Sequence, residues 1–274
     1  MSAISSPYSG PRSISYLFID GAYLRNVIER LHAEVFTNAR PQLAHQQITG
    51  SHTKVFYYDC PPAKRQQETD EQLQARMDEQ LNLYDKLREL RGWHVYEGVV
   101  KRTGEQAKQK EVDILIAVDM LTHAHRRNMH TVSFLAGDQD FRPLIDALVR
   151  DGMFVELIYD PASISKELAE AADSRVPLNP YTIFNWLEPA FQAANPLPER
   201  QSSSKRRAPE TNIEVADVPH GIAEILVMDG KYMLIRPNPE SPRMFLQMTH
   251  SDLGLLKAVH AKTFGACQWR PSEA

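Results

Sequence analysis

The chain has 274 residues, of which 42% are hydrophobic and 24% are charged, and its formal net charge is −4. This composition predicts a globular protein that can bury one substantial core, and the negative balance excludes binding of nucleic acid over the whole surface. The sequence contains no apolar run of the roughly 20 residues that cross a bilayer, and two cysteines are too few for a disulfide scaffold. We therefore expect a cytoplasmic protein without a membrane span.

In chain order, a Ser- and Pro-rich stretch comes first, and we expect residues 1–14 to be a flexible N-terminus. From residue 15 onward, short β-branched or aromatic runs alternate with longer helical patterns, which is typical of a parallel sheet covered by helices. The sequence thus predicts an α/β domain over 15–188, with strands at 16–19, 54–58, 93–97, 131–136 and 154–158 and helices at 22–33, 64–91, 112–126 and 141–150.

The composition of the chain changes after residue 188. Residues 189–212 are rich in Pro, Ala and Ser, which predicts a linker. Beyond it, Asp229-Gly230 separates two apolar runs and is a strong signal for a two-residue hairpin turn. A third strand near 244–248 and a helix over 251–264 complete a small α+β module, predicted at 213–274, whose role the sequence does not indicate.

Aspartates stand where two of the predicted strands end. Asp20 follows the first strand directly, and Asp138 and Asp140 follow the fourth, while Asp113 begins an apolar helix. Ligands of open α/β sheets bind beyond the carboxyl ends of the strands. If the first and fourth strands are neighbours, as doubly wound sheets usually have them, these four carboxylates converge at one edge of the sheet.

Carboxylates gathered in this way repel one another, by about 4 kcal/mol for each pair at about 4 Å and an effective dielectric constant of about 20. A divalent cation relieves this repulsion, and ligation by oxygen alone favours Mg²⁺ or Mn²⁺ over zinc. Such a site can generate a hydroxide nucleophile and neutralise charge on a phosphodiester. Phosphoester hydrolysis is therefore the reaction class that the aspartates indicate.

Helix capping is the competing interpretation, because a single Asp before a helix is more often an N-cap than a ligand. Asp113 and Asp140 each fit that role, whereas Asp20 has no obvious capping duty and Asp138 adds a second charge where one cap suffices. Spacing alone leaves both interpretations open. Asp119 lies six residues after Asp113, about 9 Å along a helix and on another face, so we assign it a supporting hydrogen bond.

At these positions the sequence resembles the NYN domain family, in its LabA-like branch, a group of PIN-like nucleases. The resemblance implies a PIN-like three-layer sandwich with a central parallel sheet, a Mg²⁺ or Mn²⁺ site at Asp20, Asp113, Asp138 and Asp140, and RNA as substrate. It therefore implies a metal-dependent ribonuclease. The matching blocks are Phe18-Ile19-Asp20-Gly21, Val55-Phe56-Tyr57-Tyr58-Asp59, residues 108–113, Ala117-Val118-Asp119-Met120-Leu121 and residues 135–141.

Two departures from the family pattern support an alternative function. Tyr23 stands where the family often has Asn, and Ala136 and Gln139 replace usual small residues of the fourth-strand block. The alternative is an RNA-binding regulatory protein whose nuclease-like fold has weak or no turnover. A phosphatase or DNA nuclease using the same ion is a third hypothesis.

Basic residues lead into Asp113 and are candidates for binding a phosphate backbone. They are Lys101, Arg102, Lys108 and Lys110, and Arg25 is a further candidate. A solvated loop is the alternative for the 101–110 segment. Tyr23 is either a platform for base stacking or a core aromatic residue. The expected partner is single-stranded RNA, and self-association stays open.

Overall fold

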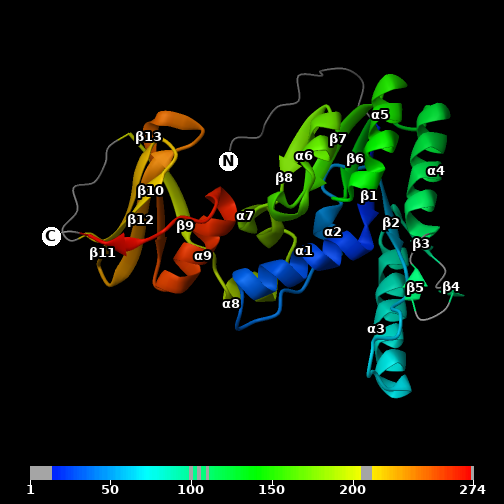
Figure 1. Ribbon diagram of the computed structural model, residues 1–274, viewed down its shortest axis with the longest axis horizontal. Coiled ribbons are helices and arrows are strands. Elements are labelled where there is room, and N and C mark those ends of the chain that lie inside the picture. The colour runs from blue at the N-terminus through cyan, green and yellow to red at the C-terminus, as the bar shows by residue number, and fades with distance from the viewer. Residues whose placement is uncertain (1–13, 99–100, 104–105, 109–110, 205–211, 273–274) are drawn as a thin grey trace. The chain divides into compact units, whose positions relative to one another are not determined.

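A computed structural model describes residues 14–98, 101–103, 106–108, 111–204 and 212–272 of the chain (Figure 1). It has two compact units. Unit 1 comprises Met1–Ile28 and His45–Leu178, and unit 2 comprises Glu29–Ala44 and Asn179–Ala274. Apart from Ile14, the N-terminus expected to be flexible lies outside the described residues. None of the described helices has the length and apolarity needed to cross a membrane.

Unit 1 is built on a six-stranded parallel sheet in the order β3-β2-β1-β6-β7-β8. The five predicted strands are confirmed, and β1 pairs directly with β6, with Ile19 opposite Leu135. The edge strand β8 was not predicted, because its four residues show no apolar alternation. The strands are β1 (Ser15–Asp20), β2 (Lys54–Asp59), β3 (Trp93–Glu97), β6 (Thr131–Leu135), β7 (Phe154–Tyr159) and β8 (Ser174–Pro177).

Alternate strand residues point to opposite faces of this sheet, and helices cover both faces. Phe18 and Phe134 lie in one core with Ile116 and Leu148. Tyr57 faces the other side, where its ring contacts Tyr84 of α3. The expected three-layer sandwich is thus confirmed. One layer contains α4 (Glu111–His125), α5 (Arg142–Arg150) and α6 (Lys166–Ala171), and the other contains α1 (Gly21–Glu34) and α3 (Asp70–Glu89), with α2 (His45–Ile48) a single short turn.

The start of α3 differs from the prediction, which placed it at residue 64. Thr69 forms a capping box with Gln72: its hydroxyl accepts the backbone N–H of Gln72, and the Gln72 side chain accepts the N–H of Thr69. This reciprocal cap fixes the helix start at Asp70. A hairpin of β4 (Lys101–Thr103) and β5 (Gln106–Lys108) precedes α4, where the sequence suggested a loop.

Unit 2 contains a six-stranded antiparallel sheet in the order β14-β10-β11-β12-β13-β9. The predicted hairpin is confirmed, and Asp229 and Gly230 both have positive φ, as a type I′ turn requires. Helix α9 (Leu253–Phe264) packs against β12 and β13. The strands are β9 (Glu199–Ser203), β10 (Asn212–Val218), β11 (Gly221–Met228), β12 (Lys231–Asn238), β13 (Ser241–His250) and β14 (Arg270–Pro271).

The range predicted as a linker contains regular structure. Helix α8 (Pro189–Ala194) and strand β9 lie within it, and α7 (Pro180–Phe184) precedes it. The strand was missed because its polar sequence has no apolar alternation and depends on pairing with β13. The ring of Phe36 contacts Phe184 and Phe191, which ties the two sequence segments of unit 2 together.

Candidate functional site

Asp20 is the last residue of β1, and α1 begins at the next residue without a loop. One oxygen of its carboxylate accepts the backbone N–H of Tyr23 at 3.0 Å. This bond is the pattern of an N-cap, so the expectation that Asp20 has no capping duty was wrong. The cap also holds the half-buried carboxylate at the carboxyl edge of the sheet.

Asp138 and Asp140 lie in the segment that follows β6, and their roles there differ from the capping interpretation of the sequence. Asp138 caps the short 3₁₀ helix Gln139–Phe141 by accepting the N–H of Asp140 at 3.0 Å. Asp140 lies inside that turn, and the residue that precedes α5 is Phe141, which has no side-chain cap. The cap in this block is therefore Asp138, and the Asp140 carboxylate is exposed to solvent.

Asp113 lies in the first turn of α4, which begins two residues earlier at Glu111. Its side chain is exposed. The N-terminal turn of a helix favours a negative charge through the partial positive charge of its free N–H groups. The helix start thus presents this carboxylate to solvent without using it as the cap.

Electrostatic coupling connects these carboxylates. The pKa of Asp20 is raised to about 6: burial is the largest cause, the Tyr23 N–H lowers the pKa, and the negative charges of Asp113 and Asp59 raise it. Partial burial also raises the pKa of Asp113, as do the charges of Asp138 and Asp140. Neighbouring aspartates at this edge are therefore close enough to disfavour the ionised forms of Asp20 and Asp113.

The electrostatics of these aspartates fit a metal ion, whereas the present spacing of their side chains does not. Mutual repulsion among oxygen ligands fits a hard divalent cation. Within the described part of the chain, however, no three His, Cys, Asp or Glu side chains are grouped closely enough to hold an ion as they stand. The side chains of Asp113, Asp138 and Asp140 are exposed and can change rotamer, so ligation by this set requires side-chain movement.

Asp119 lies further along α4 and is not grouped with the other aspartates. The hydroxyl of Tyr58, on β2, donates a hydrogen bond to the Asp119 carboxylate at 2.8 Å. This bond satisfies an acid in an otherwise apolar helix.

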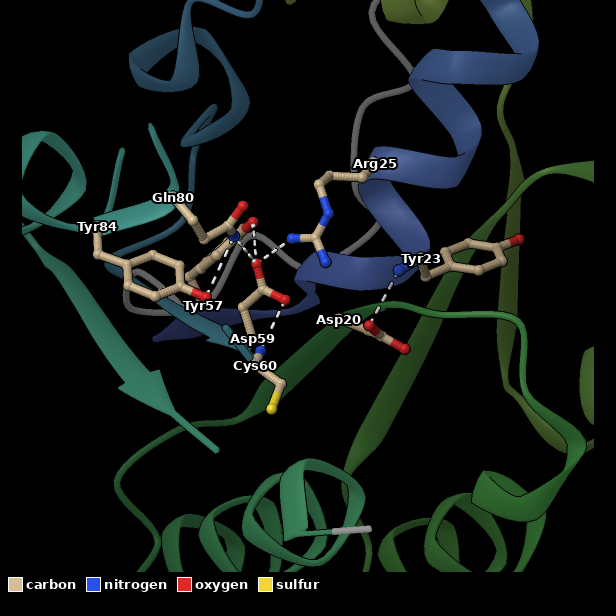
Figure 2. Close-up of polar contacts among 8 residues, drawn as sticks. All are labelled: Asp20, Tyr23, Arg25, Tyr57, Asp59, Cys60, Gln80 and Tyr84. Atoms are coloured by element: carbon tan, nitrogen blue, oxygen red, sulfur yellow. Dashed lines mark hydrogen bonds and ion pairs between the residues drawn. The ribbon is translucent and has the colours of Figure 1, made fainter. Parts of the chain in front are cut away.

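A buried carboxylate that the sequence analysis missed lies beside Asp20. Asp59 ends β2, and its side chain accepts hydrogen bonds from Arg25, Gln80, the Tyr57 hydroxyl and its neighbour's backbone N–H (Figure 2). Its side chain has no solvent exposure. The signal that found Asp20, an Asp at the end of an apolar strand, was present here as well.

Arg25 was expected to bind substrate, and in the structure it has a partner within the protein. Its guanidinium forms an ion pair with Asp59, and that bond is among the causes that raise the pKa of Arg25. Figure 2 shows one nitrogen of the guanidinium directed at the Asp59 carboxylate. The pair compensates a charge that burial would otherwise make costly.

A family model described as the NYN domain matches residues 15–179. The chain belongs to the NYN domain family. The match spans most of the chain and covers the strand ends that carry Asp20 and Asp59 as well as the cap residue Asp138. Membership agrees with the PIN-like sandwich and assigns the chain a nuclease-like fold.

Comparisons with other proteins add little to this NYN assignment. A search of curated proteins found no match. A protein of unknown function from Vibrio parahaemolyticus is similar in structure, with 16% identity, a TM-score of 0.46, and coverage of 66% of this chain and all of that one. A provisionally assigned oxidoreductase from Parabacteroides merdae has 12% identity and a TM-score of 0.25, and the alignment covers 59% of this chain and 28% of that chain.

Tyr23 occupies the position where NYN proteins often have Asn, and its role in the structure is internal. Its hydroxyl accepts the backbone N–H of Asp160 at 2.9 Å and the hydroxyl of Ser163 at 3.2 Å. Its ring lies against Gly137, where an added Cβ would come within 2.3 Å of the ring. Tyr23 thus links the ends of β1, β6 and β7, which favours the core interpretation over base stacking.

Gly137→Ala should lower the free energy of unfolding by about 1–3 kcal/mol, because the new methyl group overlaps the Tyr23 ring. The ring cannot move aside without losing its bonds to Asp160 and Ser163. Urea denaturation of both proteins measures the effect. In a Tyr23→Ala background the same Gly137 change should cost much less, and equal costs in the two backgrounds would contradict the packing explanation.

The basic residues proposed to bind RNA are only partly described. Lys101 and Arg102 lie in β4, and Lys108 pairs with Lys101 from β5. The positions of their side chains, and Lys110 as a whole, lie outside the described residues.

Proposed function

We propose that this NYN protein, of the LabA-like branch, is a metal-dependent ribonuclease that hydrolyses phosphodiester bonds of single-stranded RNA. The observation that carries the proposal is the electrostatic coupling among Asp20, Asp113, Asp138 and Asp140 at the carboxyl edge of a nuclease-like sheet. The negative charges of neighbouring aspartates raise the pKa of Asp20 and of Asp113, and a bound cation would relieve this repulsion.

Asp20, Asp113, Asp138 and Asp140 would hold Mg²⁺ or Mn²⁺. A bound ion of this kind supplies an acidified water and neutralises charge on the phosphodiester. The chain's own residues set the positions of the ligands. The Tyr23 N–H fixes one oxygen of Asp20 and the Asp140 N–H fixes one oxygen of Asp138, so each carboxylate keeps a second oxygen for other ligands.

A second candidate, an RNA-binding protein with little or no turnover, is favoured by one observation. Tyr23 fills the space above Gly137, next to Asp138, with a ring whose hydroxyl is already bonded. At this position the chain therefore has a residue that holds strand ends together.

The test is incubation of the purified full chain with labelled single-stranded RNA, with the same sequence as DNA, and with a small phosphoester. We expect cleavage of RNA with Mn²⁺ or Mg²⁺ and none with EDTA. RNA that is bound but intact under all conditions would support the second candidate. Cleavage of DNA or of the small phosphoester at a similar rate would overturn the assignment of RNA as substrate.

A further inference from the structure

Aromatic rings on one face of the unit 1 sheet lie nearly parallel to one another across β1, β2 and β3. In one row Phe18 stacks on Phe56, which stacks on His94, with interplanar angles of 11° and 21°. In the next row Tyr58 stacks on Tyr96, with ring centroids 5.1 Å apart and an angle of 14°. We call these five rings the aromatic ladder. Because stacked neighbours lie on adjacent strands, the ladder runs across the strands and ends at β3.

The end of the ladder at β3 is open. β3 is an edge strand of the six-stranded sheet, so within the described residues no further strand pairs with its free side. Phe56 and Tyr58 are buried, whereas Tyr96 is 37% exposed and His94 is only partly buried. Cross-strand packing accounts for the side of the Tyr96 ring that contacts Tyr58. The exposed side of this ring can take another planar group in a parallel stack.

Tyr96 lies at the same level of the sheet as the Asp20 carboxylate. The strand register places Asp20 opposite Tyr58, and Tyr58 opposite Tyr96. Paired residues of parallel strands share a face of the sheet, and the bond from Tyr58 to Asp119 shows that this face is the one covered by α4. At about 4.8 Å per strand, the backbones of Asp20 and Tyr96 are about 10 Å apart. A few nucleotides of one RNA strand span this distance.

The charges near Tyr96 favour a neutral base over a phosphate at this end of the ladder. The pKa of Tyr96 is raised by burial first and then by the negative charge of Asp119, so this carboxylate is close to the ring. It repels a phosphate, whereas the amino group of a base can donate a hydrogen bond to it. Cations for the phosphates of the same strand follow in the sequence, since Lys101 and Arg102 come five and six residues after Tyr96.

We propose that Tyr96 is a stacking platform for one unpaired base of an RNA strand whose phosphodiester lies at Asp20 and Asp113. The position of the phosphodiester rests on the proposed ribonuclease function, and Tyr96 takes the stacking role considered for Tyr23. Every base has a π face, so the platform is tolerant of sequence. Bases inside a double helix stack on one another and do not offer a free face. The platform therefore selects single-stranded RNA.

The first test measures binding without cleavage, by fluorescence anisotropy of labelled single-stranded RNA with the full chain in EDTA. Tyr96→Ala should weaken binding by about 5- to 150-fold, the range for loss of one stacked base. Tyr96→Phe keeps the ring and should bind as the parent does. Phe154→Ala is the matched control, because Phe154 is 48% exposed on another strand of the same sheet, and it should also bind as the parent does. Thermal melts verify that each variant is folded.

An Ala variant of Tyr96 that binds RNA as tightly as the parent would overturn the platform, as would a loss of equal size in the Phe154 variant. A parent that binds no RNA would overturn both the platform and the ribonuclease.

The second test uses the unsubstituted protein, so it does not depend on the folding of a variant. Single-stranded RNA that carries iodouridine forms a covalent bond on irradiation with an aromatic ring stacked on the modified base. Mass spectrometry of the digested complex should place this cross-link on Tyr96, and the same RNA annealed to its complement should not give it. Cross-links found only at other residues would overturn the platform.

The two proposals can fail separately. RNA that cross-links to Tyr96 but stays intact with Mn²⁺ would overturn the ribonuclease and support the platform. If the parent cut RNA and Tyr96→Ala did so with an unchanged KM, the ribonuclease would stand and the platform would be wrong.

Discussion

Asp138→Asn is expected to reduce metal-dependent RNA cleavage by about 100-fold or more while leaving unit 1 folded. Asn keeps the side-chain oxygen that accepts the Asp140 N–H, so the cap of the 3₁₀ helix survives. The substitution removes only the charge. A loss of charge stabilisation at a reacting centre costs about 10²- to 10³-fold in rate.

Thermal melts separate the metal site from simple capping. Without metal the variant should melt at the same temperature as the parent or higher, because removing the charge of Asp138 relieves its repulsion of Asp113. With millimolar Mn²⁺ the melting temperature of the variant should rise less than that of the parent, since a ligand stabilises a protein in proportion to its binding of the folded state.

The matched control is Asp78→Asn on α3, which also removes one exposed charge. There the Asp accepts a hydrogen bond from Gln74 that Asn preserves. This variant should cleave RNA and respond to Mn²⁺ as the parent does. If Mn²⁺ raised the melting temperatures of the Asp138 variant and the parent equally, Asp138 would not be a ligand. Its only role would then be to cap the 3₁₀ helix.

Arg25→Met is the second change with a large expected effect, this time on stability. It keeps much of the aliphatic length but leaves Asp59, which has no solvent exposure, without its cation. Breaking a buried ion pair on one side costs about 3–5 kcal/mol. The Arg25 side chain is 38% exposed, so the lower end, about 3 kcal/mol, is expected, or roughly 6–12 °C in Tm.

The double variant Arg25→Met with Asp59→Asn tests the cause. It removes both charges, and the amide oxygen can still accept from Tyr57 and Gln80, while the Cys60 N–H loses the second Asp59 oxygen as its acceptor. Most of the lost stability should return. If the single Arg25 variant stayed within about 0.5 kcal/mol of the parent in urea denaturation, the ion pair would contribute little, as surface pairs do.

The parts of the fold that were predicted correctly are those that depend on local periodicity. Strands such as β1 and β6 are short runs rich in aromatic and aliphatic residues, and their pairing follows from doubly wound order. The start of α3 was missed because Thr69, a single cap, outweighs the helical pattern before it. The polar strand β9 is determined by its partner β13, which lies about forty residues away.

The residues of the candidate site also divide into those that local sequence identifies and those that it does not. The four aspartates could be identified because each stands at a strand end or a helix start. The capping bonds of Asp20 and Asp138 depend on the residues at which α1 and the short 3₁₀ helix begin, which sequence patterns do not resolve. The partner of Arg25 lies 34 residues away, so its commitment to Asp59 could not be foreseen from local sequence.

Unit 2 is discontinuous in sequence, and this affects how the chain folds while it is being synthesised. Its first segment, Glu29–Ala44, leaves the ribosome before unit 1 is complete, and its second begins at Asn179. At roughly 5–20 residues per second, the intervening ~130 residues take about 7–26 s to translate. During that interval Phe36 lacks the rings of Phe184 and Phe191 that bury it in the finished protein. The nascent chain therefore displays an apolar segment that chaperones can bind until the C-terminal sheet emerges.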